Sequence, residues 1–356
     1  SNFFIILFVY PMSLNNPVLA PLSPVKSGQS GFQVPTDFLK RLNGFLGEQV
    51  ESFEPEIRHL ARYAVENSGR RLRPILVYFS GVGLDGTFLE EQVRAAAVIE
   101  LVHIATLVHD DILDGAETRR RCPTVFHKHG PSIAVLLGDA LFAHALRLAS
   151  DFPTTVVCRE VSQATRSVCA GETRQVTLRG DLNLGIGEYL RIIELKTAEL
   201  FRVSCLLGTL VVDGDDISRS QSMGSFGKHL GRAYQIFDDA ADFLGKEDSL
   251  GKTLGTDLAT RKLTLPALLL RDRIGVDGLT QLLEQLSGSP EDVRIAVTQA
   301  MEEHDIFPGV IEFFRRELHA ARVGLERSGL NKFSNSALES LVAFLENEFD
   351  KLITAS

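Results

Sequence analysis

Apolar residues recur at intervals of three and four from about residue 36 onwards, and this spacing predicts helices. The pattern is longest over residues 90–114, 132–150, 154–179, 187–212 and 219–244. Several of these stretches are apolar on more than one side, as is typical of helices buried inside a bundle. Alternation of apolar and polar residues never extends beyond a few positions. The pattern therefore predicts an all-α fold, one bundle of roughly ten or more helices around a large interior.

Short breaks separate the predicted helices, and they are rich in the residues that end helices: glycine, proline and aspartate. They fall at Gly83–Gly86, Gly130–Pro131, Asp151–Pro153, Gly180–Gly187 and Asp213–Asp216. The sequence shows no linker, low-complexity tract or short repeat between them. We therefore expect residues 36–356 to form a single domain.

The start of the chain has a different composition. The stretch from Pro11 to Pro35 holds five of the 13 prolines among serine, glycine and asparagine, which predicts a disordered segment. Residues 3–10 are apolar but span only eight positions, whereas a membrane helix needs about 20. They lack the basic start of a signal peptide, and Met12 is a candidate native start. We expect residues 1–35 to be a disordered lead-in to a soluble, cytoplasmic protein.

Composition and charge narrow the function. The chain has 356 residues, with 37 Lys and Arg against 46 Asp and Glu, and a formal net charge of −9. A nucleic-acid-binding protein needs a basic face that displaces counterions from phosphates, so this balance argues against nucleic acid as a partner. The four cysteines are scattered, without a Cys-x-x-Cys pair. That spacing favours free thiols in a reducing cytoplasm.

Two groups of aspartates with identical spacing end two of the predicted helices. Their carboxylates stand at positions i, i+1 and i+4, and i and i+4 share one face of a helix. Carboxylates on an apolar helix need a counter-charge or a metal. One such group is explained equally well by a solvated acidic helix end, but two point to divalent cations that bridge phosphate oxygens, as magnesium does. The residues are Asp110, Asp111 and Asp114, then Asp238, Asp239 and Asp242.

Basic residues accompany both aspartate groups. Arg119 and Arg120 follow the first group, and an arginine pair can grip a phosphate through two hydrogen bonds. Arg70 and Arg73 open an earlier helix. Any one of these pairs is explained equally well as surface charge, but together with the carboxylates they predict a site for polyphosphate and metal. Further basic candidates downstream lie in Lys196-Thr197, Gly251-Lys252 and Arg261-Lys262.

These motifs resemble the trans-isoprenyl diphosphate synthase family over residues 66–270 and, more loosely, on to residue 356. The matching motifs are GRRLRP (69–74), HDDILD (109–114), GETRQ (171–175), KTAEL (196–200), QIFDDAAD (235–242) and the stretch from GKTLGTDL to RKLTLP (251–266). The resemblance implies the isoprenoid synthase fold with a deep central cavity. It also implies a chain-elongating prenyltransferase similar to the long-chain, octaprenyl type. In that reaction three magnesium ions assist the ionisation of an allylic diphosphate, and isopentenyl diphosphate attacks the resulting cation.

The resemblance also implies roles for individual residues. All six aspartates bind magnesium, and those with a catalytic role, together with Lys196, are Asp110, Asp111, Asp114, Asp238 and Asp239. The contacts to the allylic diphosphate are Arg119, Lys196, Thr197, Gln235, Lys252 and Lys262. The isopentenyl diphosphate site consists of Arg70, Arg73, His103 and Arg120. Two positions depart from the family: Arg70 replaces a usual lysine and keeps its charge, and Arg121 replaces a frequent glycine with an effect that stays open.

Product length in this family depends on the residues four and five positions before the first aspartate, where short-chain members carry aromatic side chains. Here these positions hold Thr106 and Ala105, which are small. The resemblance therefore implies a deep pocket and a product of C30 or longer. The alternative is that a large residue on another helix, such as Phe142 or Leu146, closes the pocket earlier and gives C20.

Other functions stay open at this point. A class I terpene cyclase shares an aspartate-rich helix, but its second metal site normally uses Asn, Ser and Glu. Head-to-head condensing enzymes use a different acidic spacing, and non-catalytic partner subunits of such synthases usually lose the aspartates. The apolar helix faces between residues 90 and 150 and the family's habit predict a homodimer. A long polyprenyl product would bring at most transient membrane contact.

Overall fold

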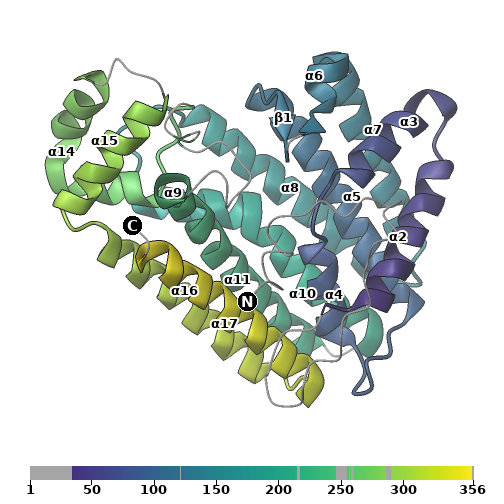
Figure 1. Ribbon diagram of the computed structural model, residues 1–356. Helices are drawn as coiled ribbons and strands as arrows, with labels where there is room; N and C mark the ends of the chain where they lie inside the picture. The colour runs from purple at the N-terminus through teal and green to yellow at the C-terminus, as the bar shows by residue number, and fades with distance from the viewer. Residues whose placement is uncertain are drawn as a thin grey trace, which may run out of the picture. The chain divides into compact units, whose positions relative to one another are not determined.

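A computed structural model describes residues 34–120, 122–214, 217–245, 255, 257, 260–285 and 290–354 (Figure 1). The chain divides into two compact units. Unit 1 comprises Ser1–Gln163, Val203–Met223 and Ser328–Leu341, and unit 2 comprises Ala164–Arg202, Gly224–Arg327 and Val342–Ser356. Of the predicted lead-in, residues 1–35, all but the last two lie outside the described residues.

Unit 1 is built from helices and one very short hairpin. Its helices are α2 (Thr36–Glu51), α3 (Pro55–Glu66), α4 (Leu72–Gly81), α5 (Glu90–Leu113), α6 (Val125–His129) and α7 (Pro131–Ser150), with parts of α8 (Thr155–Thr177), α10 (Glu199–Asp213), α11 (Ile217–Leu244) and α17 (Lys332–Thr354). The hairpin pairs β1 (Thr118–Arg119) antiparallel with β2 (Cys122–Pro123). The predicted all-α fold is confirmed.

Unit 2 contains the remaining elements. They are α9 (Ile186–Ile193), the π-helical turn η1 (Glu194–Ala198), α14 (Leu265–Gln285), α15 (Pro290–Glu303), α16 (Phe307–Arg327) and the rest of α8, α10, α11 and α17. In this unit α16 and α17 run antiparallel, side by side (Figure 1). The rings of Phe314 and Phe349 stack 3.9 Å apart between them, and Arg322 bonds Glu346 at 2.7 Å.

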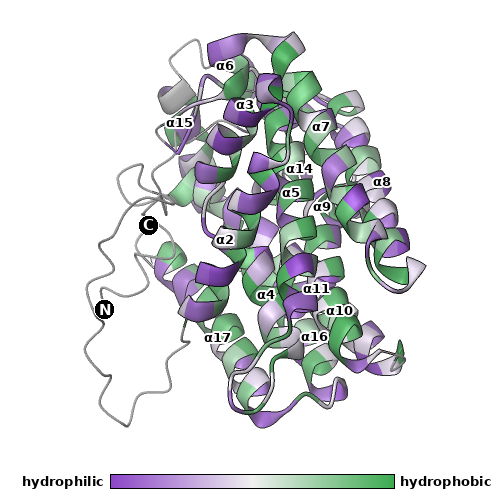
Figure 2. Cartoon of the chain, turned by 90° about the vertical axis from the view of Figure 1, so that its right-hand side faces the viewer, coloured by the Kyte–Doolittle hydropathy of each residue, from purple (hydrophilic) through white to green (hydrophobic). Residues whose placement is uncertain are grey.

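Helix α5 is the central element of unit 1. It packs against α2, α4 and α7, and its residues from Val93 to Val102 are buried almost throughout, except for Arg94. This agrees with the sequence pattern, which is apolar on several sides. Helix α2 is instead amphipathic: it buries Phe38, Leu42 and Leu46 and turns polar residues outward (Figure 2).

Close contact between α4 and α10 depends on two glycines. A Cβ atom on Gly81 would lie 2.0 Å from the carbonyl oxygen of Gly208, and one on Gly208 would lie 2.3 Å from that of Val77. Because glycine lacks a Cβ, the two backbones can touch. This contact fixes α4, which carries the first arginine motif at its start.

Among the described residues one helix, α7, is long and apolar enough to cross a membrane by length and composition. One of its faces is buried through Leu137 and Leu141, in a helix that packs against α5. Another face leaves Val135 and Leu136 exposed by 43% and 60%. This helix therefore covers the core of unit 1 and also offers an apolar surface.

Candidate active site

The first aspartate group lies at the end of α5. Asp110 is in the last turn, and Asp114 caps the helix by donating its backbone N–H to the Asp110 carbonyl at 2.9 Å. Asp111 is only 6% exposed and accepts a hydrogen bond from Arg119 Nε at 2.8 Å. Burial raises the pKa of Asp111 and the nearby Asp114 adds to the rise, while the charge and hydrogen bond of Arg119 oppose it. Arg119 is therefore the counter-charge of this group.

The β1–β2 hairpin brings the two arginines to different partners. Arg119 pairs with Cys122 in the hairpin, and Arg120 follows it with a left-handed φ of 52°. The guanidinium of Arg120 donates to the backbone carbonyl of Ser68, against the face of Gly69 where a Cβ would collide with it. The neighbouring Arg121, whose role the sequence left open, lies outside the described residues.

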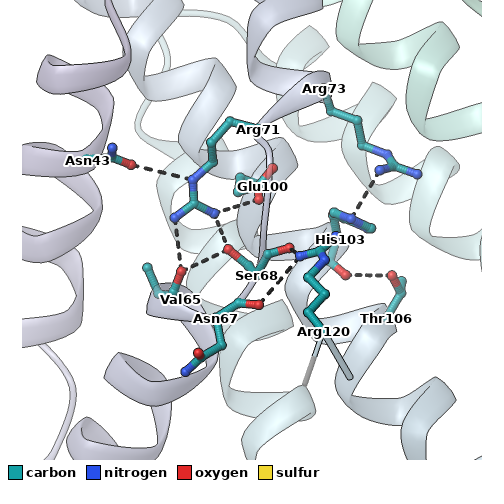
Figure 3. A network of polar contacts seen from close by, with 10 residues as sticks. All are labelled: Asn43, Val65, Asn67, Ser68, Arg71, Arg73, Glu100, His103, Thr106 and Arg120. Carbon is teal, nitrogen blue, oxygen red and sulfur yellow. Dashed lines mark hydrogen bonds and ion pairs between the residues drawn. The ribbon is translucent and has the colours of Figure 1, made fainter. Parts of the chain in front are cut away.

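A cluster of positive charge surrounds His103 on α5 (Figure 3). Nη1 of Arg73 lies 3.1 Å from Nε2 of His103. Burial holds the pKa of His103 well below its usual value, and the charges of Arg73 and Arg120 lower this pKa further. The imidazole is therefore neutral near pH 7, so it can donate or accept a hydrogen bond among the arginines. Such a cluster attracts an anion with several oxygens.

Arg70 lies in an unusual stretch of backbone at the start of the arginine motif. It is half-buried and stands between Gly69, with φ 106°, and Arg71, with φ 56°. Three of the four residues predicted for isopentenyl diphosphate, namely Arg73, His103 and Arg120, are thus brought together by the contacts and charges described above. The fourth directly precedes the turn that leads into α4.

The two residues predicted to set product length lie one turn before Asp110. Ala105 is fully buried, whereas Thr106 keeps 9% exposure and lies on the face of Asp110, four residues on. The hydroxyl of Thr106 donates to the carbonyl of His103 at 2.7 Å. Both side chains are therefore buried, Thr106 slightly less than Ala105. Phe142 is partly buried on α7, with its ring 5.8 Å from that of His109.

The second aspartate group lies near the end of α11, in unit 2. Asp239 and Asp242 are 4% and 1% exposed, and Asp238 is partly buried. Asp239 accepts hydrogen bonds from Tyr189 Oη at 2.5 Å and from Gln235 Nε2 at 2.8 Å. The backbone N–H of Asp257 donates to Asp242 at 3.2 Å. Neutral donors therefore hold Asp239 and contribute to the placement of Asp242.

Asp257 adds a fourth carboxylate to this group. Burial raises its pKa well above the ordinary value, and the charges of Asp239, Asp242 and Asp238 raise this pKa further, while that of Lys262 lowers it. The backbone N–H of Lys262 also donates to the Asp257 carbonyl at 2.7 Å. Lys262 thus lies near the group, as predicted, and the predicted Lys252 lies outside the described residues.

Lys196 lies in η1, a π-helical turn of a kind often found at functional sites. Its Nζ lies 2.5 Å from Glu172 Oε2 and 2.7 Å from Gln175 Oε1. The next residue, Thr197, donates its hydroxyl to Gln235 Oε1 at 2.7 Å. Through Gln235 the predicted Thr197 therefore connects to Asp239.

The donor chemistry of both groups fits magnesium. Mg²⁺ takes carboxylate oxygens, usually from one or two residues, and completes its shell with waters and substrate phosphates. The clustered carboxylates of unit 2 raise the pKa of Asp257, which a cation would relieve. In the part of the chain that the structure describes, no group of three His, Cys, Asp or Glu side chains is arranged to hold a metal ion by itself. The donors therefore fit an ion shared with a phosphate ligand.

Sequence reasoning missed several residues of these groups. Asp257, Glu172 and Gln175 lie inside the family motifs, but their residue types alone predict no role for them. Tyr189 gave no signal, because one tyrosine on an apolar helix face is ordinary. Glu100 was visible as the polar exception on an apolar helix, and its partner Arg71 as the middle arginine of its motif.

Comparison with known proteins identifies the family of the chain. The polyprenyl synthetase family model matches residues 54–303. The heptaprenyl diphosphate synthase component 2 of Bacillus subtilis is 34% identical over 241 residues, 64% of this chain and 68% of that protein. The geranylgeranyl diphosphate synthase of Mycobacterium tuberculosis is 37% identical over 209 residues, 58% of this chain and 59% of that protein.

A solved structure extends the likeness to the fold. The decaprenyl diphosphate synthase from Rhodobacter capsulatus superposes with a TM-score of 0.78 at 28% identity, covering 88% of this chain and 97% of that one. The family is generally magnesium-dependent. The chain belongs to the polyprenyl synthetase family and is a trans-prenyltransferase.

Proposed function

We propose that the chain elongates an allylic diphosphate with isopentenyl diphosphate and releases a product of C30 or longer. The C–O bond of the allylic diphosphate breaks and pyrophosphate leaves with the electron pair. The double bond of isopentenyl diphosphate then attacks the allylic cation, and one proton is lost to the released pyrophosphate. The proposal needs no side-chain base.

The observation that carries the proposal is the arginine cluster around His103. A terpene cyclase handles one diphosphate, whereas an elongating enzyme must bind two. Besides the carboxylate groups, unit 1 has Arg73 and Arg120 beside a neutral imidazole, which suits a second diphosphate. Arg70 joins this site in the proposal.

The remaining residues hold the allylic diphosphate. Lys196 supplies a positive charge, and Glu172 and Gln175 fix its position. Thr197 and Gln235 orient the hydrogen bonds around Asp239. Arg119, Lys252 and Lys262 complete the set. The six aspartates would hold magnesium, three ions in the proposal, which when bound neutralises charge developing on the leaving pyrophosphate.

Product length is the finer part of the proposal. The proposal is supported by the small size of Thr106, on the face of Asp110, where an aromatic side chain would take up more space. Relatives range from C20 to C50, so identity alone does not choose a length. The first test incubates the purified chain with magnesium, labelled isopentenyl diphosphate and farnesyl diphosphate, and sizes the dephosphorylated products. A ladder ending at C30 or longer is expected; a stop at C20 would move the pocket floor to another residue.

A matched pair of variants tests the role of Thr106. Thr106→Phe is expected to shorten the product. Thr173→Phe is the control, because Thr173 also bonds its hydroxyl to a helix carbonyl but is exposed on α8. If Thr106→Phe left the distribution of product lengths unchanged, Thr106 would not form the floor of the product pocket. The fully buried Ala105 is a poorer site, because phenylalanine there would overpack the core.

The proposed assembly is a cytoplasmic homodimer with transient membrane contact during product release. The exposed Val135 and Leu136 on α7 support an apolar interface. A sedimentation mass of one subunit at micromolar concentration would oppose the dimer. The name of the Bacillus relative, component 2 of a synthase, makes a required second chain the competing assembly. Turnover by the purified chain alone would exclude it.

A further inference from the structure

A buried ion pair lies beside the arginine cluster of unit 1 (Figure 3). Arg71 Nη1 and Glu100 Oε1 are 2.6 Å apart, and their side chains are only 5% and 2% exposed. Arg71 also donates to Ser68 Oγ, to the Val65 carbonyl at 3.0 Å and to Asn43 Oδ1 at 3.4 Å. The guanidinium is thus held from several sides by protein groups.

Stability alone does not explain this pair. Taking two charges out of water is costly, and apolar residues of similar volume often stabilise a fold as well as a buried ion pair. Arg71 moreover adopts a left-handed φ of 56°, which a side chain with a Cβ rarely takes. A charged residue kept in a strained backbone conformation points to a functional constraint.

The pair connects the loop that carries the arginines to the helix that carries the histidine. Arg71 is the N-cap of α4 and stands between Arg70 and Arg73. Glu100 precedes His103 by three residues on α5, so the two side chains lie on the same side of that helix. The pair therefore sets the loop and the histidine in a fixed relation.

Ser68 extends this connection to the hairpin. Its hydroxyl accepts from Arg71, while its backbone carbonyl accepts from Arg120. One loop residue is thus fixed by the buried arginine on one side and by a predicted ligand-binding arginine on the other. Any shift of Arg71 would move this carbonyl and release Arg120.

We infer that Arg71 and Glu100 are positioning residues for the isopentenyl diphosphate site, which they hold in its binding geometry without contacting substrate. The inference rests on the proposed function of the arginine cluster. Preorganised groups bind more tightly because less order has to be gained on binding. Loss of the pair is expected to raise the KM for isopentenyl diphosphate about 10–100-fold, since a small displacement of contact groups has effects of this size. The KM for the allylic substrate and kcat at saturation should change little.

The test replaces the pair by apolar residues of similar size. The double variant Arg71→Met/Glu100→Leu is compared with wild type for thermal midpoint and for KM towards both substrates. The matched control is Asp213→Leu/Arg219→Met, which removes another ion pair of unit 1, 2.9 Å long, between the end of α10 and the start of α11. The first double variant should raise only the isopentenyl diphosphate KM, and the control should raise neither. An unchanged isopentenyl diphosphate KM in a folded first variant would overturn the inference.

Two further measurements cover the cases in which the double variant does not fold or isopentenyl diphosphate does not bind. If the double variant does not fold, Glu100→Gln replaces it, because it keeps the size of the side chain but removes the carboxylate charge that holds the guanidinium of Arg71. A rise in the isopentenyl diphosphate KM alone then supports positioning, and equal KM values for wild type and variant, or an equal rise for both substrates, overturns it. Calorimetric titration with isopentenyl diphosphate separates the two levels of argument. If wild type binds none, the proposed function fails; if wild type and variant bind equally, only the inference about the pair fails.

Discussion

The two aspartate groups share their spacing but differ in what surrounds them. In unit 1, Asp111 is paired with the guanidinium of Arg119 at 2.8 Å, and Asp114 lies at the open end of α5. In unit 2, Asp239 accepts from the neutral Tyr189 and Gln235. The same motif thus has a bonded guanidinium at Asp111 in one unit and hydrogen bonds from uncharged groups at Asp239 in the other, where the charge of Lys262 also acts on Asp257.

The two aspartate groups also differ in the number of carboxylates that they bring together. Asp257 brings a fourth carboxylate into the unit 2 group, and its pKa is raised by burial and by its acidic neighbours. Excess negative charge in a buried setting is costly without a cation. We therefore expect the unit 2 group, with this additional carboxylate, to gain more from a bound cation than the unit 1 group.

The largest effect is expected from Asp239→Asn. The substitution keeps the shape of the side chain but removes a charge where the metal would be held, so kcat should fall about 10²–10³-fold. Steady-state kinetics with saturating magnesium measures this loss. Asp181→Asn is the matched control in unit 2, because Asp181 is exposed and accepts only a local turn bond. Near-wild-type turnover in Asp239→Asn would exclude a metal role for this carboxylate.

The helices and the aspartate groups were predictable because both depend on local spacing. The apolar period of 90–114 gave α5 almost to the residue, and the i, i+4 rule placed Asp110 and Asp114 together. The tiny β1–β2 hairpin was not predictable, since two-residue strands have no period. Its effect is large nevertheless, because it brings Arg119 to Asp111.

What the sequence could not supply is the choice of partner between distant segments. Tyr189 and Asp239 are 50 positions apart, and Arg71 and Glu100 are 29 apart. Arg119 was assigned to the allylic diphosphate, yet its hydrogen bond to Asp111 depends on how a hairpin folds back over a helix end. Charge and spacing identify such residues as candidates, whereas packing decides which of them meet.

The second prediction concerns how much bound magnesium stabilises the fold through each aspartate group. Magnesium at about 100 times its Kd should stabilise the fold by about 2.7 kcal/mol and raise the thermal midpoint by a few degrees. Because the unit 2 group has the greater excess charge, Asp242→Asn should lose most of this shift and Asp111→Asn much less. Thermal unfolding with magnesium and with EDTA measures both. Equal losses of the magnesium-induced shift in the two variants would show that the two aspartate groups contribute equally to metal binding.

The third prediction concerns the neutral donor itself. Tyr189→Phe removes the hydroxyl that bonds Asp239 at 2.5 Å and leaves the carboxylate in place. A hydrogen bond to a charged group contributes about 1.5–3 kcal/mol, so the magnesium concentration for half-maximal rate should rise about tenfold or more. A magnesium titration of the rate gives this value. The control is Tyr234→Phe, at another tyrosine of the same unit, on α11. An equal rise in the half-maximal magnesium concentration there would show that the bond from Tyr189 to Asp239 has no specific effect.

The smallest expected effects are on the pH dependence of the free energy of unfolding, through one titratable group in each unit. Burial and the arginines lower the pKa of His103 in unit 1. The unfolded chain then binds the proton first, and the stability contributed by neutral His103 is complete above pH of about 6.5 and declines below it. In unit 2 burial opposes ionisation of Glu317, but the hydrogen bond of His229 and the charge of Arg232 outweigh it and lower the pKa of Glu317. This contribution is complete above pH of about 4.5 and is lost as the pH falls through the lowered pKa.

The two groups therefore act in separate pH windows. Between pH 6.5 and 5 the free energy of unfolding should fall by about 1 kcal/mol per pH unit at most from His103. Urea unfolding across this range should show a weaker slope in His103→Gln, while Glu317→Gln should change the slope only below pH of about 4.5. If His103→Gln kept the wild-type slope, the pKa of the imidazole would be the same in the folded and the unfolded chain. Burial and the arginines would then not lower this pKa, and the imidazole would not be the buried neutral group on which the fit of the cluster to a diphosphate depends.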